Sequence, residues 1–350
     1  GNAVATSLCA EVSELMYPMT LQGYMRAPRI DMDAGIAAAG ATNQPNADGL
    51  TVNDYLKIKN AEARTLAFPL VSGFLNMDKY IPLVMMNAGF TLELTLCDAN
   101  RIGVSRTEAA ATNQGAFVDS LWTVQSCKYV AHLIDLDRSF YDKLRAVMES
   151  SGGVLQLAGQ TYRHFVGELP LSTGPHTITI PARVKSVKSI FGTFIRASQM
   201  GANSSYDTSV FQTAFLSKYR FEIGSVRYPQ TDVNAQTAEN EVELQKAWGR
   251  LGDYNHQQAY SAKHTRNAED PRTGSTYATS LLSSFAIGYD FEAFQRVALE
   301  AGINTADRSL PINFICERTA NATASTRVDF FVLTDAIYYI NLDGTVSVSI

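Results

Sequence analysis

Apolar and polar residues alternate along much of this chain with a period of two, and this pattern constrains its fold more than any other feature. In FTLELTL (90–96), every second residue is large and apolar. Near the end, Val346, Val348 and Ile350 alternate with polar residues, after an Asp343-Gly344 pair typical of a two-residue hairpin turn. Because successive strand side chains point to opposite faces, each such segment predicts a strand buried on one side.

Strands of this kind are predicted along most of the sequence. They are rich in β-branched and aromatic residues and are bounded by Gly, Pro, Asn or Ser. The break at Asn87-Ala88-Gly89 separates two of them. The predicted strands cover residues 65–75, 80–86, 90–97, 122–134, 153–159, 176–184, 188–197, 218–228, 284–289, 310–317 and 327–350. The sequence therefore predicts an all-β protein.

Helices are predicted to be few and short, at residues 6–16, 138–150, 238–251 and 290–302. In the second, Asp137 is placed to act as the N-cap, Phe140, Leu144 and Val147 form an apolar stripe, and Gly152 ends the helix. Such helices are expected to cover a sheet edge or the mouth of a barrel rather than to bind a cofactor.

The charge balance argues against a nucleic-acid-binding role. The 350 residues are 46% hydrophobic and 18% charged, with a net charge of −5. A basic patch or arm is usual in nucleic-acid-binding proteins. The basic cluster Arg183, Lys185 and Lys188, followed by Arg196, is interpreted as the solvated face of a strand. Two explanations of the low fraction of charged residues stay open. Partners could cover much of the surface, or the solvent-exposed faces could be rich in Thr, Ser, Asn and Gln.

Metal-binding and nucleophilic motifs are missing from the sequence. The cysteines, at 9, 97, 127 and 316, have no C-x-x-C spacing, and Cys316 shares a predicted strand face with Ile312 and Phe314. We interpret them as small buried residues of a reduced protein. The histidines, at 132, 164, 176, 256 and 264, form no metal-binding motif, and His132 is interpreted as a hydrogen-bonded strand residue. No residue is predicted to be catalytic, to bind a cofactor or to bind a metal.

Carboxylate pairs and glycosylation sequons are the remaining candidates for functional sites in the sequence. Asp31/Asp33 and Asp135/Asp137 have the spacing that places two carboxylates on one strand face, suited to a cation or to acid–base work. The first pair lies in a turn-like region, however, and Asp137 is the expected N-cap. The glycosylation sequons at Asn203 and Asn321 are interpreted as chance matches.

Long polar segments at 35–50, 103–116, 198–209 and 252–278 are predicted to be loops. Loops of this length in a compact domain are usually functional or mobile. The segments 35–50, 198–209 and 252–278 are therefore our candidates for contacts between subunits.

The order of predicted elements occurs twice, which suggests an internal duplication. The second half begins with strands that have no counterpart in the first half. We therefore expect residues 1–136 to be a first domain whose N-terminal strands lie upstream of Gly1. Residues 137–152 are expected to be a linker helix, and residues 153–350 a second, complete domain.

Several segments resemble the double jelly-roll major capsid proteins of icosahedral DNA viruses and phages. Residues 66–96, with Phe-Pro-Leu and Ile-Pro-Leu before an alternating strand, are similar to the late strands of that family's first barrel. Residues 122–144 resemble its last strand and the linker helix. The second barrel's early and closing strands are matched by residues 177–198, 218–233, 285–317 and 327–344.

The resemblance implies two tandem jelly-roll barrels with a few short helices, and a structural role without enzymatic activity. It implies homotrimeric, pseudo-hexameric capsomers in an icosahedral virion. The expected partners are the chain itself, neighbouring capsomers and minor capsid or penton proteins, with or without a membrane beneath the shell, but no specific nucleic-acid sequence. Such a protein would be made in the host cell and reside in the virion.

A carbohydrate- or receptor-binding jelly-roll protein, such as a viral spike or a lectin, is the alternative. It would need a shallow aromatic patch, for which Trp122 and Trp248 are the tryptophans present. A jelly-roll enzyme is a third hypothesis, and it would need a metal or carboxylate cluster that the sequence does not suggest.

Overall fold

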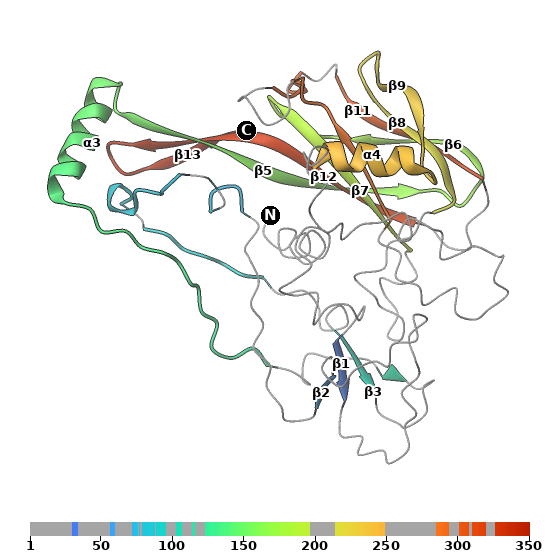
Figure 1. Ribbon diagram of the computed structural model, residues 1–350, viewed down its shortest axis with the longest axis horizontal. Coiled ribbons are helices and arrows are strands. Elements are labelled where there is room, and N and C mark those ends of the chain that lie inside the picture. Colours follow the sequence, from blue (N-terminus) through green and yellow to red (C-terminus); the bar gives the residue numbers. More distant parts are fainter. Residues whose placement is uncertain are drawn as a thin grey trace.

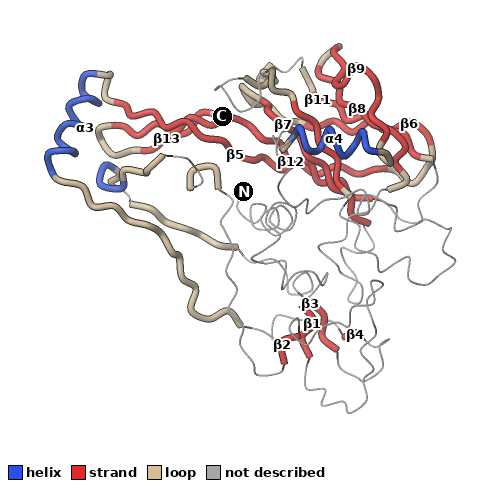
Figure 2. Tube along the Cα trace, viewed as in Figure 1, coloured by secondary structure: helices blue, strands red, loops and turns tan. Residues whose placement is uncertain are grey.

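The fold was obtained as a computed structural model (Figure 1). The structure describes the backbone of residues 30–33, 57–59, 103–106 and 114–115. It also describes 72–75, 77, 79–87, 89–95, 123–196, 214–248, 285–293, 301–307, 310–319 and 326–350. The predicted helix at 6–16 and the predicted contact loops 35–50, 198–209 and 252–278 lie outside these residues. Figure 2 shows that strands dominate the described part of the second half, as predicted.

The first sheet of this half is antiparallel and has β12 (Thr326–Asn341) at its centre. β5 (Val154–Leu169) pairs with β12 along its whole length, from Thr326↔Leu169 to Asn341↔Val154. The other edge of β12 pairs first with β7 (Val187–Arg196) and then with β13 (Val346–Ser349). β10 (Ala286–Asp290) pairs with β7 and completes the sheet.

The second sheet is antiparallel and has the order β6-β11-β8-β9. β6 (Gly174–Ile180) and β8 (Leu216–Ile223) flank β11 (Ile312–Arg318), and β9 (Val226–Asn234) pairs with β8. Buried and half-buried residues alternate strictly along β11, so this sheet buries one face and presents the other to solvent.

The pairing of these strands defines a jelly roll. β5 pairs with β12, β6 with β11, β7 with β10, and β8 with β9. The first of these eight strands therefore pairs with the last, the second with the seventh, the third with the sixth and the fourth with the fifth. The nested hairpin is closed into two sheets by the pairs β12–β7 and β11–β8. Eight strands in two facing sheets with this topology form a jelly roll.

The core between the two sheets is aromatic. Phe314 of β11 is fully buried and lies 5.2 Å from Phe330 of β12, 5.4 Å from Phe221 and 6.2 Å from Phe194 (ring centroids). These residues come from both sheets, so the alternation read from the sequence is what brings the inner faces together.

Helix α4 (Ala238–Ala247) closes the barrel beside β10, as expected for a covering helix. The hydroxyl of Thr237 accepts a hydrogen bond from the Glu239 amide and caps the helix. Asn240 is fully buried; it accepts a hydrogen bond from the Tyr219 hydroxyl (2.9 Å) and donates one to the Ala286 carbonyl (3.0 Å). The helix is thereby fixed to both sheets.

Helix α3 (Arg138–Ser150) has the bounds predicted from the sequence, but its apolar stripe is not buried as expected. Phe140 and Val147 are 47% and 59% exposed, and Met148 is the buried residue of the helix. Asp137 occupies the N-cap position, yet its carboxylate accepts a bond from the Ser139 hydroxyl and not from a backbone amide. Gly152, with a positive φ of 88°, follows the end of the helix, as predicted.

The predicted strands at 65–75, 80–86, 90–97 and 122–134 are not formed where the structure describes them, and residues 73–75 are a turn. Residues 83–85 form a 3-10 turn, and residues 89–95 and 123–137 are not in a ladder. A strand requires a neighbour for its backbone groups, and alternation alone does not supply one. The expected helix at 290–302 is not seen at 291–293 or 301–302, where the chain is not helical, and its middle lies outside the described residues.

The described strands before residue 120 form a separate sheet of order β2-β1-β3-β4. In it, β1 (Ile30–Asp33) is parallel to β2 (Lys57–Lys59) and to β3 (Gly103–Arg106), while β4 (Gln114–Gly115) is antiparallel to β3. Asp31 and Asp33 therefore lie in a strand and not in the expected turn. The division into domains stays a prediction.

Candidate assembly surface

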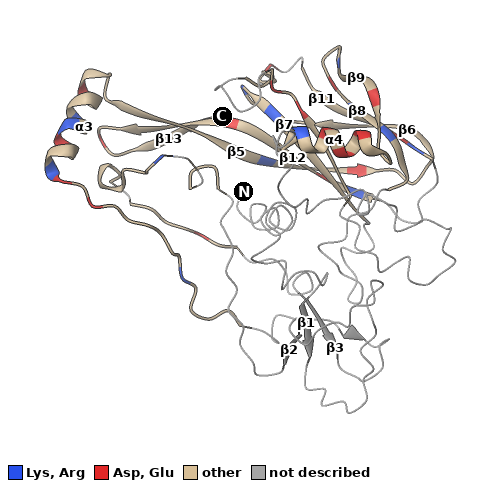
Figure 3. Cartoon of the chain, in the orientation of Figure 1, with Lys and Arg blue, Asp and Glu red and all other residues tan. Residues whose placement is uncertain are grey.

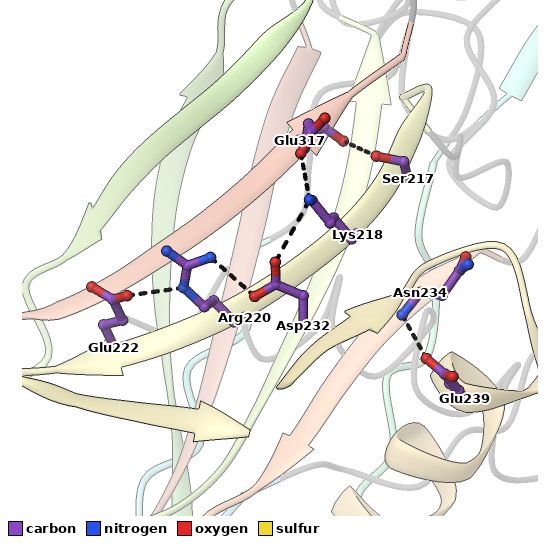
Figure 4. A network of polar contacts seen from close by, with 8 residues as sticks. All are labelled: Ser217, Lys218, Arg220, Glu222, Asp232, Asn234, Glu239 and Glu317. Carbon is purple, nitrogen blue, oxygen red and sulfur yellow. Dashed lines mark hydrogen bonds and ion pairs between the residues drawn. The ribbon is translucent and has the colours of Figure 1, made fainter. Parts of the chain in front are cut away.

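The outer face of the β6-β11-β8-β9 sheet carries a network of ion pairs (Figure 4). Arg220 of β8 contacts Glu222 (2.9 Å) and Asp232 of β9 (3.0 Å). Lys218 lies 2.8 Å from Glu317 of β11 and 3.9 Å from Asp232. Arg227 of β9 lies 3.4 Å from Glu222, so three cations and three carboxylates are grouped across three strands and neutralise each other.

This network leaves the face polar but without excess charge. Hydrogen bonding to Glu222 raises the pKa of Arg220, and hydrogen bonding to Glu317 raises that of Lys218. Thr179 and Asn313 are hydrogen-bonded beside it, Oγ1 to Oδ1, at 2.8 Å. A face whose charges are already paired can be covered by another protein surface at a smaller desolvation cost than a face of isolated charges.

The outer face of the other sheet is covered near α4. Phe191, Ala286 and Phe331 pack against Leu244 and Ala247 of the helix. Trp248 stacks on Phe191 with centroids 5.9 Å apart. One face of the Trp248 indole is therefore covered by Phe191.

A second ionic group lies on this face beside Phe331. His164 of β5 and Asp329 of β12 are 2.7 Å apart, Nε2 to Oδ1, and Arg327 donates to the same carboxylate oxygen at 2.6 Å. The imidazole stacks on Phe331, with centroids 4.9 Å apart. Spacing in the sequence could not reveal this pair, because its members are 165 positions apart and come together only through the register of β5 with β12.

The third ionic group is buried at one end of the barrel. The Lys188 ammonium lies 2.7 Å from Glu292 and 3.1 Å from Asp335. Asp335 also accepts a hydrogen bond from the Ser186 hydroxyl. Burial would lower the pKa of Lys188, but the hydrogen bonds to both carboxylates outweigh it, and its pKa is raised. This group ties β7 to β12 where β7 leaves the sheet.

The inner face of the first sheet continues past the barrel as an apolar shelf. Beyond the end of β7, the strands β5, β12 and β13 run on together towards α3 (Figure 1). Leu157, Ala336, Tyr338 and Ile340 line this shelf. Three residues of the 72–95 segment pack on it: Phe74, Met77 and Met85.

Contacts between the shelf and this earlier segment are close. The ring of Phe74 meets that of Tyr338 edge-on, with ring centroids 5.0 Å apart. The backbone N–H of Asn87 donates a hydrogen bond to the Gly344 carbonyl at 3.2 Å. Gly73 lies so near the Gln160 carbonyl that a Cβ there would be 2.2 Å from its oxygen. The second half thus provides the surface on which part of the first half rests.

The structure does not gather the carboxylate candidates into a site. Among the described residues, no group of three His, Cys, Asp or Glu side chains could hold a metal ion. Asp135 is exposed on an extended segment, and Asp137 is the N-cap residue of α3. The side chains of Asp31 and Asp33 are outside the described residues.

The histidine and cysteine interpretations are confirmed only in part. His132 lies on an exposed segment that is not in a ladder, so its predicted place in a hydrogen-bonded strand is wrong. His176 bonds to the Ser172 carbonyl at 2.8 Å. Cys316 is buried as predicted, and burial raises the pKa of its thiol to about 12, whereas Cys127 is exposed. His256, His264, Cys9, Cys97, Trp122 and both sequons lie outside the described residues.

The basic cluster is not one solvated strand face. Arg183 and Lys185 are exposed, and Lys185 donates to the Ser349 hydroxyl, but Lys188 is buried between its carboxylates. Arg196 ends β7. In the described barrel, basic and acidic residues are interspersed (Figure 3). No described helix has the length and apolar character to cross a bilayer.

The topology and these surfaces define an antiparallel jelly-roll protein that is mostly strand. In sequence, no protein family and no curated protein match the chain. Solved structures do resemble it. The PBCV-1 protein VP54, fitted into a reconstruction of the virophage Sputnik, is 8% identical with a TM-score of 0.39, over 61% of this chain and 55% of that one. The chain thus spans about half of the length of that protein.

Two further solved structures are similar. The Faustovirus major capsid protein is 9% identical with a TM-score of 0.37, over 58% of this chain and 36% of that one. The mavirus major capsid protein is 10% identical with a TM-score of 0.34, over 57% and 42%. Because these scores are low, the jelly-roll assignment rests on the strand pairing of this chain.

Proposed function

We propose that this chain is a structural major capsid protein without enzymatic activity, which forms pseudo-hexameric homotrimers in the shell of an icosahedral virion. The observation that carries the proposal is the apolar shelf. It extends a complete jelly roll past its own barrel and provides a packing surface for a second lobe of the same subunit. Two lobes per subunit around a three-fold axis give six lobes, which suits a hexagonal tile.

The surface of the barrel supports the same role. A shell subunit needs wide faces that can be covered by copies of itself. The paired charges of Lys218, Arg220, Arg227 and their carboxylates provide a polar, neutral face of this kind. Neighbouring capsomers and minor capsid proteins are the partners that this role implies.

The proposal includes a division of the chain. Residues 1–136 would belong to a first jelly roll, residues 137–152 to a linker helix and residues 153–350 to the second jelly roll. The part of the second barrel that the structure describes is a full set of eight strands. The segment 72–95 lies on its shelf, as a preceding lobe joined through α3 would.

The decisive experiment is the mass of the purified chain in solution, measured by light scattering and native mass spectrometry. The proposal expects a particle of three chains of 38.2 kDa each, stable at moderate salt because its contact faces carry few unpaired charges. An obligate interface should bury at least about 2,000 Å² per contact. A monomer at micromolar concentration, or a monomer that binds glycans on an array, would contradict the proposal and favour the carbohydrate-binding alternative.

A further inference from the structure

The part of the first sheet that runs past the barrel has two faces and is here called the ribbon. It consists of residues 154–159 of β5, 336–341 of β12 and 346–349 of β13. One face is the apolar shelf, on which the 72–95 segment packs. The opposite face, here called the outer face, carries the alternate residues Val154, Gln156, Ala158, Ile337, Tyr339, Asn341, Ser347 and Ser349. Gln156 and Ser347 are exposed and Tyr339 is partly exposed, so this face is open to solvent.

The outer face has the composition of an interface core. None of its side chains is charged, as the ribbon between α3 and the barrel shows in Figure 3. Depletion of charged residues and the presence of tyrosine distinguish the core of a protein interface from other surface. The hydroxyl and amide groups of this face both donate and accept hydrogen bonds. The face can therefore form hydrogen bonds with a copy of itself.

The two ends of the outer face carry opposite charges. At one end, exposed Lys185 donates to the Ser349 hydroxyl at 3.0 Å. At the other end, Asp343 of the turn between β12 and β13 accepts bonds from the Thr345 hydroxyl at 2.7 Å and from its backbone N–H at 2.9 Å. These bonds lower the pKa of Asp343, so its carboxylate is ionised at neutral pH. The cation and the carboxylate thus lie on opposite sides of Ser347, along the same strand.

We propose that the outer face packs against the outer face of a second copy of this chain. The two-fold axis lies between the faces, runs across the strands and passes near Ser347. Rotation about this axis exchanges the two ends of the face and keeps each strand over its counterpart, as in aligned packing of two sheets. Lys185 of each copy then lies opposite Asp343 of the other, and the uncharged residues fill the centre.

This contact goes beyond the proposed function, because a homotrimer is built on a three-fold axis and this contact on a two-fold axis. It would join subunits of different capsomers. The face is only three strands wide, so the contact should bury less than the roughly 1,200 Å² at which stable interfaces begin, and it should be weak and reversible. A trimer should therefore persist on dilution, whereas the twofold step should depend on concentration.

Sedimentation velocity of the 350-residue chain tests the contact over a wide range of concentration. Ser347→Glu places two carboxylates beside the axis in an otherwise uncharged centre, so it should weaken the twofold step by about tenfold or more. Ser172→Glu is the matched control, because it makes the same change at an exposed residue of the loop between β5 and β6. The control should associate like the wild type.

Lys185→Gln and Asp343→Asn test the orientation of the two copies. Asparagine keeps the side-chain acceptor of the turn and is well suited to a turn before glycine. Each substitution removes both symmetry-related ion pairs, so each should weaken the twofold step about threefold. The double variant should be no weaker than either single variant, because no ion pair is left for the second substitution to remove.

Hydroxyl-radical footprinting identifies the face that is covered. Tyr339 should become protected as the concentration rises, and Tyr80, which is 81% exposed in the 72–95 segment, should not. The proposal is overturned if the wild type shows no twofold step, or if Ser347→Glu associates like its control. It is also overturned if the effects of Lys185→Gln and Asp343→Asn are absent or additive, or if Tyr80 is protected instead of Tyr339. In each of these cases, a trimer that persists leaves the proposed function intact.

Discussion

The ammonium of Lys188 lies 2.7 Å from the carboxylate of Glu292, and the two side chains are only 4% and 11% exposed. With Asp335 at 3.1 Å, the lysine is enclosed by two carboxylates. Lys188→Met would leave both buried without their cation, and breaking a buried pair in this way costs about 3–5 kcal/mol. Urea unfolding should show a loss of this size in the free energy of unfolding.

Lys185 supplies the control, because it is exposed and bonded only to the Ser349 hydroxyl among its described contacts. Lys185→Met should change the free energy of unfolding by less than about 0.5 kcal/mol. Equal effects of the two substitutions would show that the buried ionic group does not stabilise the barrel.

The raised pKa of Lys188 predicts a loss of stability at high pH. A group whose pKa is higher in the folded state binds its proton more tightly in that state. Its contribution to the free energy of unfolding is therefore complete when the pH is below the ordinary lysine pKa of about 10.4. The contribution is lost as the pH rises through the folded-state pKa. The difference in unfolding free energy between wild type and Lys188→Met should stay constant from about pH 7 to 9 and narrow above about pH 10.5. A difference that narrows on acidification below pH 7 and not on the alkaline side would refute this assignment.

The jelly roll built from β5 to β12 is the most predictable part of the fold. Its strands alternate clearly, as in β11, where Ile312, Phe314 and Cys316 all face the core as expected. The expected N-cap at Asp137 and an apolar stripe predict α3, and apolar spacing alone predicts α4. The local alternation of residues is sufficient here, because each strand has neighbouring strands that accept and donate its backbone hydrogen bonds.

Predictions from the sequence were weakest where the outcome depends on residues far along the chain. The alternation of residues 90–96 and 122–134 has the same form, yet the described parts of both segments form no ladder. The pairing of His164 with Asp329 and of Lys188 with Glu292 and Asp335 depends on strand register, which composition and spacing do not reveal. The sequence therefore predicts a solvated position for Lys188, which is in fact buried.

Phe314 is the residue whose loss should harm the barrel most, because it is fully buried and contacts aromatic rings from both sheets. Phe314→Ala should destabilise the barrel by about 3–5 kcal/mol through lost burial and a residual cavity. Phe140→Ala, the same change at a side chain that is 47% exposed, should cost well under half as much. Thermal unfolding followed by near-UV circular dichroism measures both, and similar melting temperatures for the two variants would place the core elsewhere.

Cys316 and Cys127 should react very differently with iodoacetamide. The thiolate is the reactive form, and burial raises the pKa of the Cys316 thiol to about 12. Peptide mass spectrometry of the native protein at pH 8 should find Cys127 modified and Cys316 unmodified. Both should react after unfolding in urea. Rapid native labelling of Cys316 would show that the barrel opens.

Gly73 tests whether the 72–95 segment rests on the shelf. A Cβ at this position would lie 2.2 Å from the Gln160 carbonyl oxygen and 2.7 Å from the Tyr338 hydroxyl, and the carbonyl belongs to a strand that cannot move far. Gly73→Ala should therefore displace the segment while the barrel stays folded. Hydrogen exchange and limited proteolysis should become faster over residues 72–95, with the unfolding of β5 and β12 little changed.

Lys79→Ala, at an exposed site in the same segment, should leave exchange and cleavage as in the wild type. If Gly73→Ala behaves like this control, the segment is not held by the shelf. If the segment does rest on the shelf, the added methyl group must clash with the Gln160 carbonyl and separate the rings of Phe74 and Tyr338. A variant without any effect would therefore show that the contact between Phe74 and Tyr338 does not join the two halves of the chain.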